Sequence, residues 1–203
     1  MRMRKKKWVG AFLEEGNKYL YEEASSIDFD KTVYLEIGMG MGDFLVESAK
    51  RNPEIFYVGL EREDTCVARA VKKAEEAGVE NIAIFHEDAS LLNEIFPSRS
   101  ISRIYLPFSD PWPKKRNHKR RLTYPTFLKI YAEILKDEGD IIFKSDNDSL
   151  FEDTLEYIKE SPFEAVCVEE DYYRIERDDV MTAYERKFRE QGQPIHFVEM
   201  RKK

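Results

Sequence analysis

The sequence predicts an α/β fold: a mostly parallel seven-stranded sheet with helices on both faces and an antiparallel edge strand. From about residue 32, short runs rich in β-branched and aromatic residues alternate with longer helix-like runs, as in βαβ units. The last two strand-like runs lie close together in the chain, with mostly loop or short helix between them. This short connection favours an antiparallel pair at one edge of the sheet.

The regular alternation predicts five strands, and two more follow near the C-terminus. The expected strands are 33–37, 55–60, 82–85, 101–106, 139–143, 163–168 and 195–200. The expected helices are 43–51, 63–77, 90–96, 124–135 and 149–160. Pro53 ends the first of these helices, and Gly78 closes the second as a C-terminal cap. Residues 1–31 lie outside the alternation and are predicted to form a basic extension to a single domain over 32–203.

Length and composition exclude several classes of protein. The chain has 203 residues, of which 42% are hydrophobic, which is enough for one domain with a real core. The longest apolar runs, such as 141–143, are too short to span a bilayer, and the basic first residues lead into no apolar signal-peptide region. The two cysteines cannot form a disulfide framework or a Cys-rich zinc site, and the three histidines are scattered. We therefore expect a reduced, cytoplasmic protein that needs no metal.

Positive charge is concentrated in two segments of an acidic chain. The net charge is −7, yet residues 1–7 hold five basic residues and residues 114–121 hold six, with no acid in either segment. Outside them, 22 basic residues face 40 acidic ones. A polyanion would be attracted to the two segments and repelled elsewhere, which would guide its orientation. The alternative is a solvated loop and a solvated terminus.

A glycine turn between the first expected strand and the first expected helix is a candidate cofactor site. Ligands of open α/β sheets bind outside the carboxyl ends of the strands, where glycines let a ligand approach the backbone. The spacing here is G-x-G-x-G, with Gly38 and Gly40 inside it, rather than the G-x-G-x-x-G of dinucleotide sites. Glu36 and Asp43 flank the turn and would repel a pyrophosphate but suit a cation such as the sulfonium of S-adenosylmethionine.

Two further acids support that cofactor. Glu61 ends the second expected strand, where a carboxylate can accept from both ribose hydroxyls of a nucleoside. Asp88 follows the third expected strand and is placed to meet the adenine amine. A single acid after a strand is commonly structural, but three acids after three consecutive strands, together with the glycine turn, predict S-adenosylmethionine.

The loop after the fourth expected strand reads S-D-P-W-P-K-K-R over 109–116. Pro111 and Pro113 restrict its backbone and would hold Asp110 and Trp112 in place. In sheets of this order the fourth strand lies beside the first, so the loop would hang over the ligand crevice. The alternative is that Asp110 caps a helix and Trp112 packs in the core, which leaves the adjoining basic run unexplained.

Four motifs together carry a family resemblance. They are E-x-G-x-G-x-G-x-F at 36–44, F-S-D-P-W-P-K-K-R at 108–116, K-R-R-L at 119–122 and T-x-Y-E-x-K-F at 182–188. Over about residues 2–200 the chain resembles the bacterial tRNA (guanine-N7-)-methyltransferases. The resemblance implies a Rossmann-like class I methyltransferase fold that uses S-adenosylmethionine. It also implies transfer of the methyl group to N7 of a guanine at position 46 of the tRNA variable loop, which forms 7-methylguanosine.

The resemblance also implies roles for individual residues. The cofactor-binding acids of the family fall on Glu36, Glu61, Asp88 and Asp110, and its catalytic aspartate also matches Asp110. Its substrate-binding residues fall on Lys114, Asp146, Thr182, Tyr184 and Glu185. The chain departs from the usual family pattern at Pro107, Asn117 and Ser145.

The chemistry of guanine constrains how these residues act. N7 carries a lone pair and no proton, so Asp110 would serve orientation and electrostatics rather than proton removal. The commonest contact to guanine, an Arg or Lys on O6 and N7, would cover the acceptor atom. Carboxylates on the Watson–Crick edge are the alternative, and Asp110, Asp146 and Glu185 are candidates. Asp146 could instead cap a helix near Ser149, and Glu185 could be an ordinary surface acid.

Basic residues would hold the phosphates of the extruded or unstacked RNA segment. The candidates are residues 2–7 and Lys115, Arg116, Lys119, Arg120 and Arg121. Three other readings compete with a tRNA methyltransferase: a non-catalytic RNA-binding module on the same fold, a methyltransferase acting on a small molecule or protein, and an NAD-dependent oxidoreductase. We expect a monomer or homodimer with tRNA as its partner, no membrane attachment and no obligatory protein partner.

Overall fold

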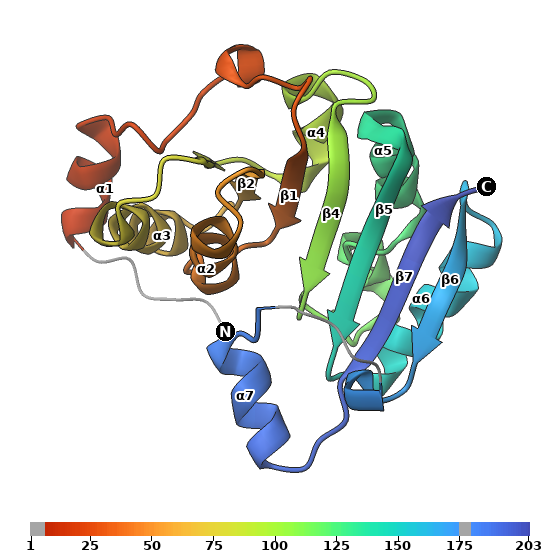
Figure 1. The fold of residues 1–203 in the computed structure, drawn as a ribbon. Coiled ribbons are helices and arrows are strands. Elements are labelled where there is room, and N and C mark those ends of the chain that lie inside the picture. Colours follow the sequence, from red (N-terminus) through yellow and green to blue (C-terminus); the bar gives the residue numbers. More distant parts are fainter. Residues whose placement is uncertain (1–6, 175–179) are drawn as a thin grey trace.

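A seven-stranded sheet crosses the molecule in a computed structural model that describes residues 7–174 and 180–203 (Figure 1). Its strand order is β3-β2-β1-β4-β5-β7-β6. The strands are β1 (Val33–Ile37), β2 (Phe56–Leu60), β3 (Ile82–Phe85), β4 (Ile101–Pro107), β5 (Leu135–Ser145), β6 (Phe163–Glu169) and β7 (His196–Lys202). Strands β1 to β5 pair in parallel, and β7 runs antiparallel between β5 and the edge strand β6. The predicted fold class is confirmed.

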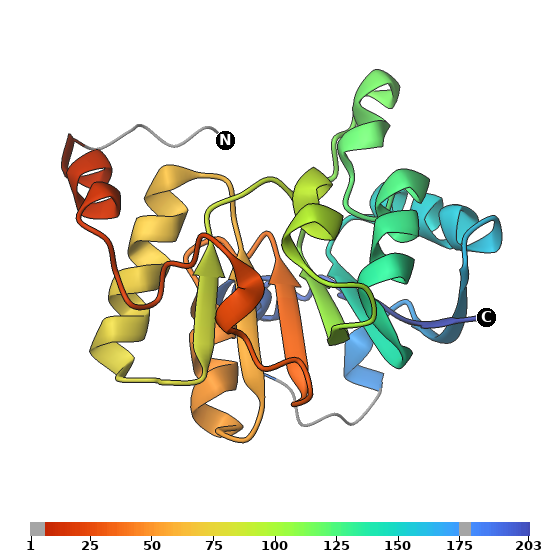
Figure 2. The same cartoon turned by 90° about the horizontal axis from the view of Figure 1, so that it is seen from above.

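Helices cover both faces of the sheet (Figure 2). The helices are α1 (Lys7–Glu14), α2 (Asp43–Arg51), α3 (Asp64–Ala77), α4 (Leu92–Ile95), α5 (Pro125–Ile134), α6 (Asp148–Lys159) and α7 (Ala183–Glu190), with short 3-10 helices at Ala24–Ser26, Ala89–Leu91, Lys115–Arg120 and Tyr172–Arg174. Apolar residues of α4, α5 and α6 pack with alternate residues of the strands in one cluster, and those of α2 and α3 pack in another. None of the helices within the described ranges is both long and apolar enough to cross a bilayer.

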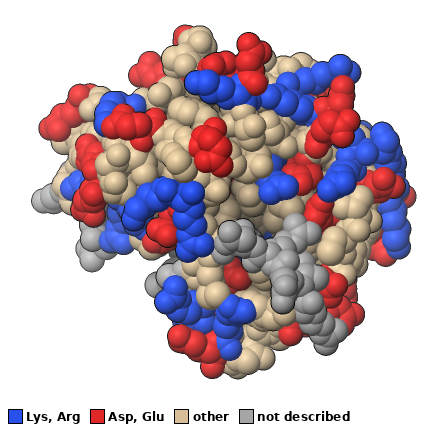
Figure 3. Space-filling model, in the orientation of Figure 1, with Lys and Arg blue, Asp and Glu red and all other residues tan. Residues whose placement is uncertain are grey.

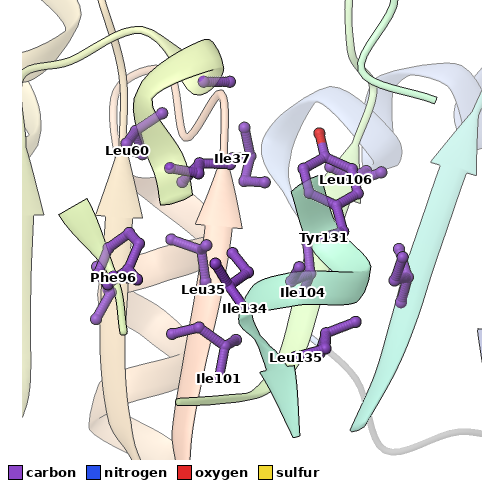
Figure 4. Close-up of a cluster of buried hydrophobic side chains, with 14 of the residues drawn as sticks. Leu35, Ile37, Leu60, Phe96, Ile101, Ile104, Leu106, Tyr131, Ile134 and Leu135 are labelled. Carbon is purple, nitrogen blue, oxygen red and sulfur yellow. The ribbon is translucent and has the colours of Figure 1, made fainter. Parts of the chain in front are cut away.

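The larger cluster lies between the sheet and α5. Leu35, Ile104 and Leu106 point from neighbouring strands toward Tyr131 and Ile134 of α5, and all five are fully buried (Figure 4). Each buried side chain of this size stabilises the fold by about 1.5–3 kcal/mol relative to an exposed one. The cluster therefore fixes β1 and β4 side by side, which sets the position of the loops that follow them.

Strand β5 begins earlier than its sequence predicts. We expected it from residue 139, but it starts at Leu135, directly after α5. Leu135 pairs with Ile101 and Asp140 pairs with Arg103, so the register shifts between these pairs. The polar residues between them, 136–138, gave no strand signal because the irregularity turns them away from the core.

The segment before β1 is not detached from the domain. Helix α1 packs on α3, and Val9 is buried. Further along, the Ile84 N–H donates to the carbonyl of Tyr19 at 2.7 Å, and the Tyr21 N–H donates to the carbonyl of Ile84 at 2.9 Å. This pairing covers the outer edge of β3, which would otherwise expose unpaired backbone groups. The predicted division into 1–31 and 32–203 stays a prediction, and residues 1–6 lie outside the described residues.

Close approach of α2 and α3 depends on one glycine. Gly42 has φ of 72°, and a Cβ placed on it would lie 2.8 Å from the Cβ of Ala70. Gly42 therefore meets two requirements at once, the left-handed backbone at the start of α2 and the contact with α3.

We predict that Gly42→Ala lowers the free energy of unfolding by at least about 2 kcal/mol, because it adds overpacking to backbone strain. Gly78→Ala is the matched control: its φ is 63°, but no atom lies within 4 Å of the added Cβ. The control should lose only about 1 kcal/mol, from the backbone alone. Urea denaturation measures both variants, and equal losses would contradict a tight contact between α2 and α3.

Candidate active site

A cavity of about 510 Å³ opens at the carboxyl ends of β1 to β4. This volume is typical of small-molecule sites. The predicted site residues Gly38, Glu61, Asp88 and Asp110 line it together, although they come from four different loops. Trp112, Lys119 and Arg120 line the side formed by the loop after β4. The predicted cofactor crevice and the predicted basic loop therefore meet in one place.

The glycine turn is a run of left-handed backbone. Gly38, Gly40 and Gly42 have φ of 75°, 55° and 72°, a region that other residues rarely adopt. The N–H groups of Gly38 and Met39 donate to the carbonyl of Leu60 at 2.8 and 3.2 Å, which ties the turn to the end of β2. This conformation lets a ligand approach the backbone closely without meeting side chains.

Glu61 fastens the turn from the next strand. Its Oε2 accepts from the Gly40 N–H at 3.1 Å, and its Oε1 accepts from the N–H groups of Arg62 and Glu63 at 2.8 and 3.0 Å. A carboxylate has about four acceptor positions, so one position remains, which suffices for one ribose hydroxyl rather than for both as expected. Glu61 thus joins the turn to β2 while its carboxylate faces the cavity.

Glu36 lies at the end of β1 and is only 3% exposed. Burial, reinforced by the charges of Asp43 and Glu61, raises the pKa of its carboxyl well above the usual value. A hydrogen bond from the Leu45 N–H lowers this pKa but does not outweigh burial. Its Oε2 is buried and has no hydrogen-bond partner among the residues that the structure describes. Such an atom is costly unless a donor reaches it, so Glu36 fits a cationic or hydrogen-bonding ligand group.

Asp88 is held in its ionised form. Burial alone would raise the pKa of its carboxyl, but hydrogen bonds from Ser90 and Arg62 outweigh burial and lower it. The Ser90 N–H and Oγ donate to Oδ1 at 3.0 and 2.8 Å, and Arg62 lies 3.4 Å from Oδ2. Oδ2 keeps room for another donor, such as an exocyclic amine.

The loop after β4 contains two strained residues. Phe108 and Trp112 have φ of 53° and 41°, and each non-glycine residue in this region costs about 1–3 kcal/mol. The Phe108 N–H donates to the carbonyl of Lys144 at 2.9 Å, which holds the start of the loop on β5. Asp110 stands exposed between these two residues at the cavity mouth. Backbone strain of this kind is characteristic of functional loops.

The basic segment that follows is exposed, with one exception. Lys114, Lys115, Arg116, Lys119 and Arg120 are all exposed, and the 3-10 helix Lys115–Arg120 carries four of them. The run differs from the face seen in Figure 3, where Lys and Arg are interspersed with Asp and Glu. The exposed basic residues lie on both sides of the half-buried Asn117 and His118, with no acid between them, and this suits a polyanion.

The RNA-backbone prediction for Arg121 is wrong. Its side chain is only 1% exposed, its Nε donates to the carbonyl of Pro111 at 2.7 Å, and its Nη1 pairs with the carboxylate of Asp153. A guanidinium buried on these partners has no face left for a phosphate. The sequence could not separate Arg121 from its neighbours because its partner Asp153, in α6, lies 32 residues further along the chain.

Asp146 and Tyr184 meet beside the same loop. The Tyr184 hydroxyl donates to Asp146 Oδ2 at 3.5 Å, and its ring lies 5.0 Å from that of Phe108. Burial raises the pKa of Tyr184, as do the nearby charges of Asp146 and Asp110. The alternative that Asp146 caps α6 is wrong, because Asn147 is the cap and accepts from the Leu150 N–H. Asp146 is therefore free of a capping role at this site.

Thr182 and Glu185 build the start of α7. Thr182 is the N-terminal cap, and its Oγ1 accepts from the Glu185 N–H at 3.0 Å. Glu185 is only 1% exposed, so the alternative of an ordinary surface acid is wrong. Its Oε2 lies 3.5 Å from Nζ of Lys144, and its Oε1 accepts from the Tyr173 hydroxyl at 3.3 Å. In this arrangement the carboxylate faces Lys144 and does not line the large cavity.

Sequence reasoning missed Lys144. It lies in β5, two residues before the predicted residue Asp146. Its side chain is buried, and its Nζ lies 4.1 Å from the centre of the Tyr172 ring. A lysine at the end of the apolar run 141–143 was the available signal, because lysine is rarely buried unless paired.

Among the described residues, no group of three or more His, Cys, Asp or Glu could hold a metal ion. The expectation that no metal is needed stays a prediction.

The strand order and the cavity at the carboxyl ends of the strands are those of the Rossmann-like class I methyltransferase fold. Among solved structures, an antibiotic-related methyltransferase aligns with a TM-score of 0.60 at 16% identity, over 89% of this chain and 97% of that one. The 16S rRNA methyltransferase KamB aligns with a TM-score of 0.63 at 15% identity, over 85% of this chain and 88% of that one. At these identities the likeness concerns the fold alone.

Sequence similarity identifies the family. The family model described as "Putative methyltransferase" matches residues 30–198. A relative from Bacillus velezensis, named tRNA (guanine-N(7)-)-methyltransferase, is 38% identical over 98% of this chain and 96% of its own length. A relative of the same name from Staphylococcus aureus is 42% identical over 98% and 97%. The chain belongs to the family of tRNA (guanine-N(7)-)-methyltransferases, and the resemblance is confirmed.

We predict that Glu36→Gln becomes increasingly stabilising as the pH rises from about 5 to 8. The pKa of Glu36 is raised in the folded protein, so the folded state favours the protonated carboxyl. The stability that this carboxyl contributes is fully present below its pKa in the unfolded chain and is lost as the pH rises toward its pKa in the folded protein. The difference from wild type should grow by more than about 1 kcal/mol over this range. Urea denaturation of the protein without ligand at both pH values measures it.

Glu76→Gln, on the exposed surface of α3, is the control and should show a difference that does not change with pH. A constant difference for Glu36→Gln as well would show that the folded protein does not hold this carboxyl protonated.

Proposed function

We propose that this protein transfers a methyl group from S-adenosylmethionine to N7 of a guanine in tRNA, at position 46 of the variable loop, and so forms 7-methylguanosine. One observation carries the proposal: Asp110 stands between the cavity and the exposed basic segment, on a strained loop. Relatives named tRNA (guanine-N(7)-)-methyltransferase over nearly their whole length support the same substrate. The non-catalytic alternative explains the basic segment but not the acids around the cavity.

The residues around the cavity fit S-adenosylmethionine. The cofactor offers hydrogen-bond donors, namely an ammonium, two ribose hydroxyls and an adenine amine, and when bound it supplies an electrophilic methyl group on a sulfonium. Glu61 suits the ribose and Asp88 suits the amine, and both line the cavity. Glu36 does not line it but directly precedes the lining residue Ile37, and its buried, unpartnered Oε2 suits a donor. Gly38 and Gly40 would let the backbone approach the ligand. Asp110 would complete the site at its mouth.

Asp110 orients the guanine rather than removing a proton. Because N7 already has a lone pair, catalysis rests on holding it in line with the methyl group. Asp110 and Asp146 accept hydrogen bonds from N1–H and the N2 amine on the Watson–Crick edge. Tyr184, which is 47% exposed beside Asp146, offers a ring on which an extruded base can stack.

Thr182 and Glu185 support this substrate segment from within. Thr182 caps α7, and Glu185 is held against Lys144, so both fix Tyr184 at the start of the helix. We propose that their contribution to substrate binding passes through this geometry.

Exposed basic residues hold the tRNA phosphates. Lys114 stands nearest to Asp110 in the chain, and Lys115, Arg116, Lys119 and Arg120 extend the contact. The predicted contribution of residues 2–7 falls largely outside the described residues. A cytoplasmic location, and a monomer or homodimer without an obligatory protein partner, stay predictions.

The first experiment is methyl transfer to unmodified tRNA. Purified protein with labelled S-adenosylmethionine should give 7-methylguanosine in the variable loop after nuclease digestion and nucleoside analysis. Binding of S-adenosylmethionine without label in the RNA would reject the proposed reaction and favour the non-catalytic module.

We predict that Asp110→Asn keeps tRNA affinity within about twofold but lowers turnover roughly 100-fold, because misplacing the base by about 1 Å has an effect of this size. Single-turnover rates and filter binding separate the two quantities. Asp30→Asn, at an exposed position before β1, is the control and should behave as wild type. Wild-type turnover in Asp110→Asn would remove Asp110 from the mechanism.

Salt should weaken tRNA binding steeply but leave cofactor binding nearly unchanged, since phosphate contacts release counterions. The slope of log K against log salt should fall by about one in Lys115→Ala. Equal salt sensitivity of tRNA and S-adenosylmethionine binding would refute this division between the two sites.

A further inference from the structure

Arg121 is the one buried member of the basic segment over 114–121. Its side chain is 1% exposed, although Lys119 and Arg120 directly before it are exposed. Burying a guanidinium is unfavourable unless its donors are satisfied. Nε donates to the carbonyl of Pro111 at 2.7 Å, and Nη1 pairs with Asp153 of α6. One side chain therefore joins the loop after β4 to a helix that lies beyond β5 in the chain.

The bond to Pro111 acts directly beside Asp110. Because a peptide unit is planar, a fixed carbonyl also fixes the orientation of the following N–H, here that of Trp112. Trp112 is strained, with φ of 41°, and strain of this kind persists only where surrounding contacts impose it. The other strained residue, Phe108, is held by its N–H bond to Lys144. The loop is thus held at both ends, and Asp110 stands between the two attachments.

The chain after Arg121 is anchored on the same helix. Oγ1 of Thr123 lies 2.7 Å from Oγ1 of Thr154, and both side chains are fully buried. Thr154 also donates to the carbonyl of Leu150 within α6. This buried contact fixes the backbone two residues from Arg121. The backbone next to Arg121 is therefore fixed on α6, and the guanidinium fixes the Pro111 carbonyl relative to the same helix.

We propose that Arg121 is a positioning residue for methyl transfer: by tying the Pro111 carbonyl to Asp153, it sets the geometry of Asp110 and Trp112 and makes no contact with RNA. The proposal rests on the proposed function for the role of Asp110. Loss of the tie should lower turnover and leave tRNA affinity unchanged, which is the opposite of what loss of a phosphate contact does.

The chain allows a direct readout of loop geometry. It has two tryptophans, Trp8 in α1 and Trp112 in the loop. In a Trp8→Phe background, the fluorescence of Trp112 and its quenching by acrylamide report the environment of the loop without any turnover. Trp8 lies outside the cavity lining, so this background should keep wild-type activity.

In that background, Arg121→Lys should reduce kcat at saturating tRNA at least about tenfold, because lysine cannot bond Pro111 and Asp153 in the same fork. The tRNA Kd and its salt slope should stay within about twofold of wild type, while the quenching of Trp112 changes. Asp153→Asn keeps the bond to Pro111 and should give a smaller change of the same kind. The double variant should be no worse than Arg121→Lys, because both changes act on one contact.

Arg116→Ala is the matched control from the exposed part of the same segment. It should weaken tRNA binding and lower the salt slope, with kcat and Trp112 quenching unchanged. The proposal is overturned if Arg121→Lys behaves like Arg116→Ala, or if it leaves both kcat and Trp112 quenching at wild-type values. If wild type forms no 7-methylguanosine, the proposed function fails, while the response of Trp112 still tests the tie itself.

Discussion

The parallel pairing of β1 with β2 on one side and with β4 on the other is the constraint on which the site depends. From β1 the chain leaves toward β2 and β3, and it returns across the sheet to β4. The loops at this reversal diverge and open a crevice at the carboxyl ends of the strands. Glu61, Asp88 and Asp110 gather there only because each follows a strand that runs in the same direction.

Sequence pattern was sufficient for this framework but not for the contacts within the site. The bounds of α2 and β3 were predicted to the residue because alternation and glycine signals are local. Burial of Arg121 and Glu185 was not predictable, because their partners Asp153 and Lys144 come from elements distant in the chain. The sequence of a basic run predicts that all its side chains are exposed, and only the fold shows which of them is buried.

Several charges buried near the cavity serve geometry more than stability. The ion-paired residues Arg121, Lys144 and Glu185 are each nearly inaccessible to solvent. Buried ion pairs commonly stabilise a fold no more than apolar residues would, because desolvation offsets their attraction. They do impose a single arrangement, since an unpaired partner is strongly unfavourable. Burial of these charged groups therefore contributes an unfavourable desolvation free energy, which the apolar cluster around Leu35 and Tyr131 offsets.

The two edges of the sheet are unlike each other, and this difference limits how molecules can associate. Residues 19–21 pair with β3 and close that edge, whereas β6 ends the sheet on the other side with Val166 and Val168 exposed. A sheet with one open edge can accept a single additional strand, after which a pair of molecules has no free edge left. A sheet with two open edges can grow without limit. In the part of the chain that the structure describes, the three residues 19–21 before β1 thus favour self-limiting association over polymerisation.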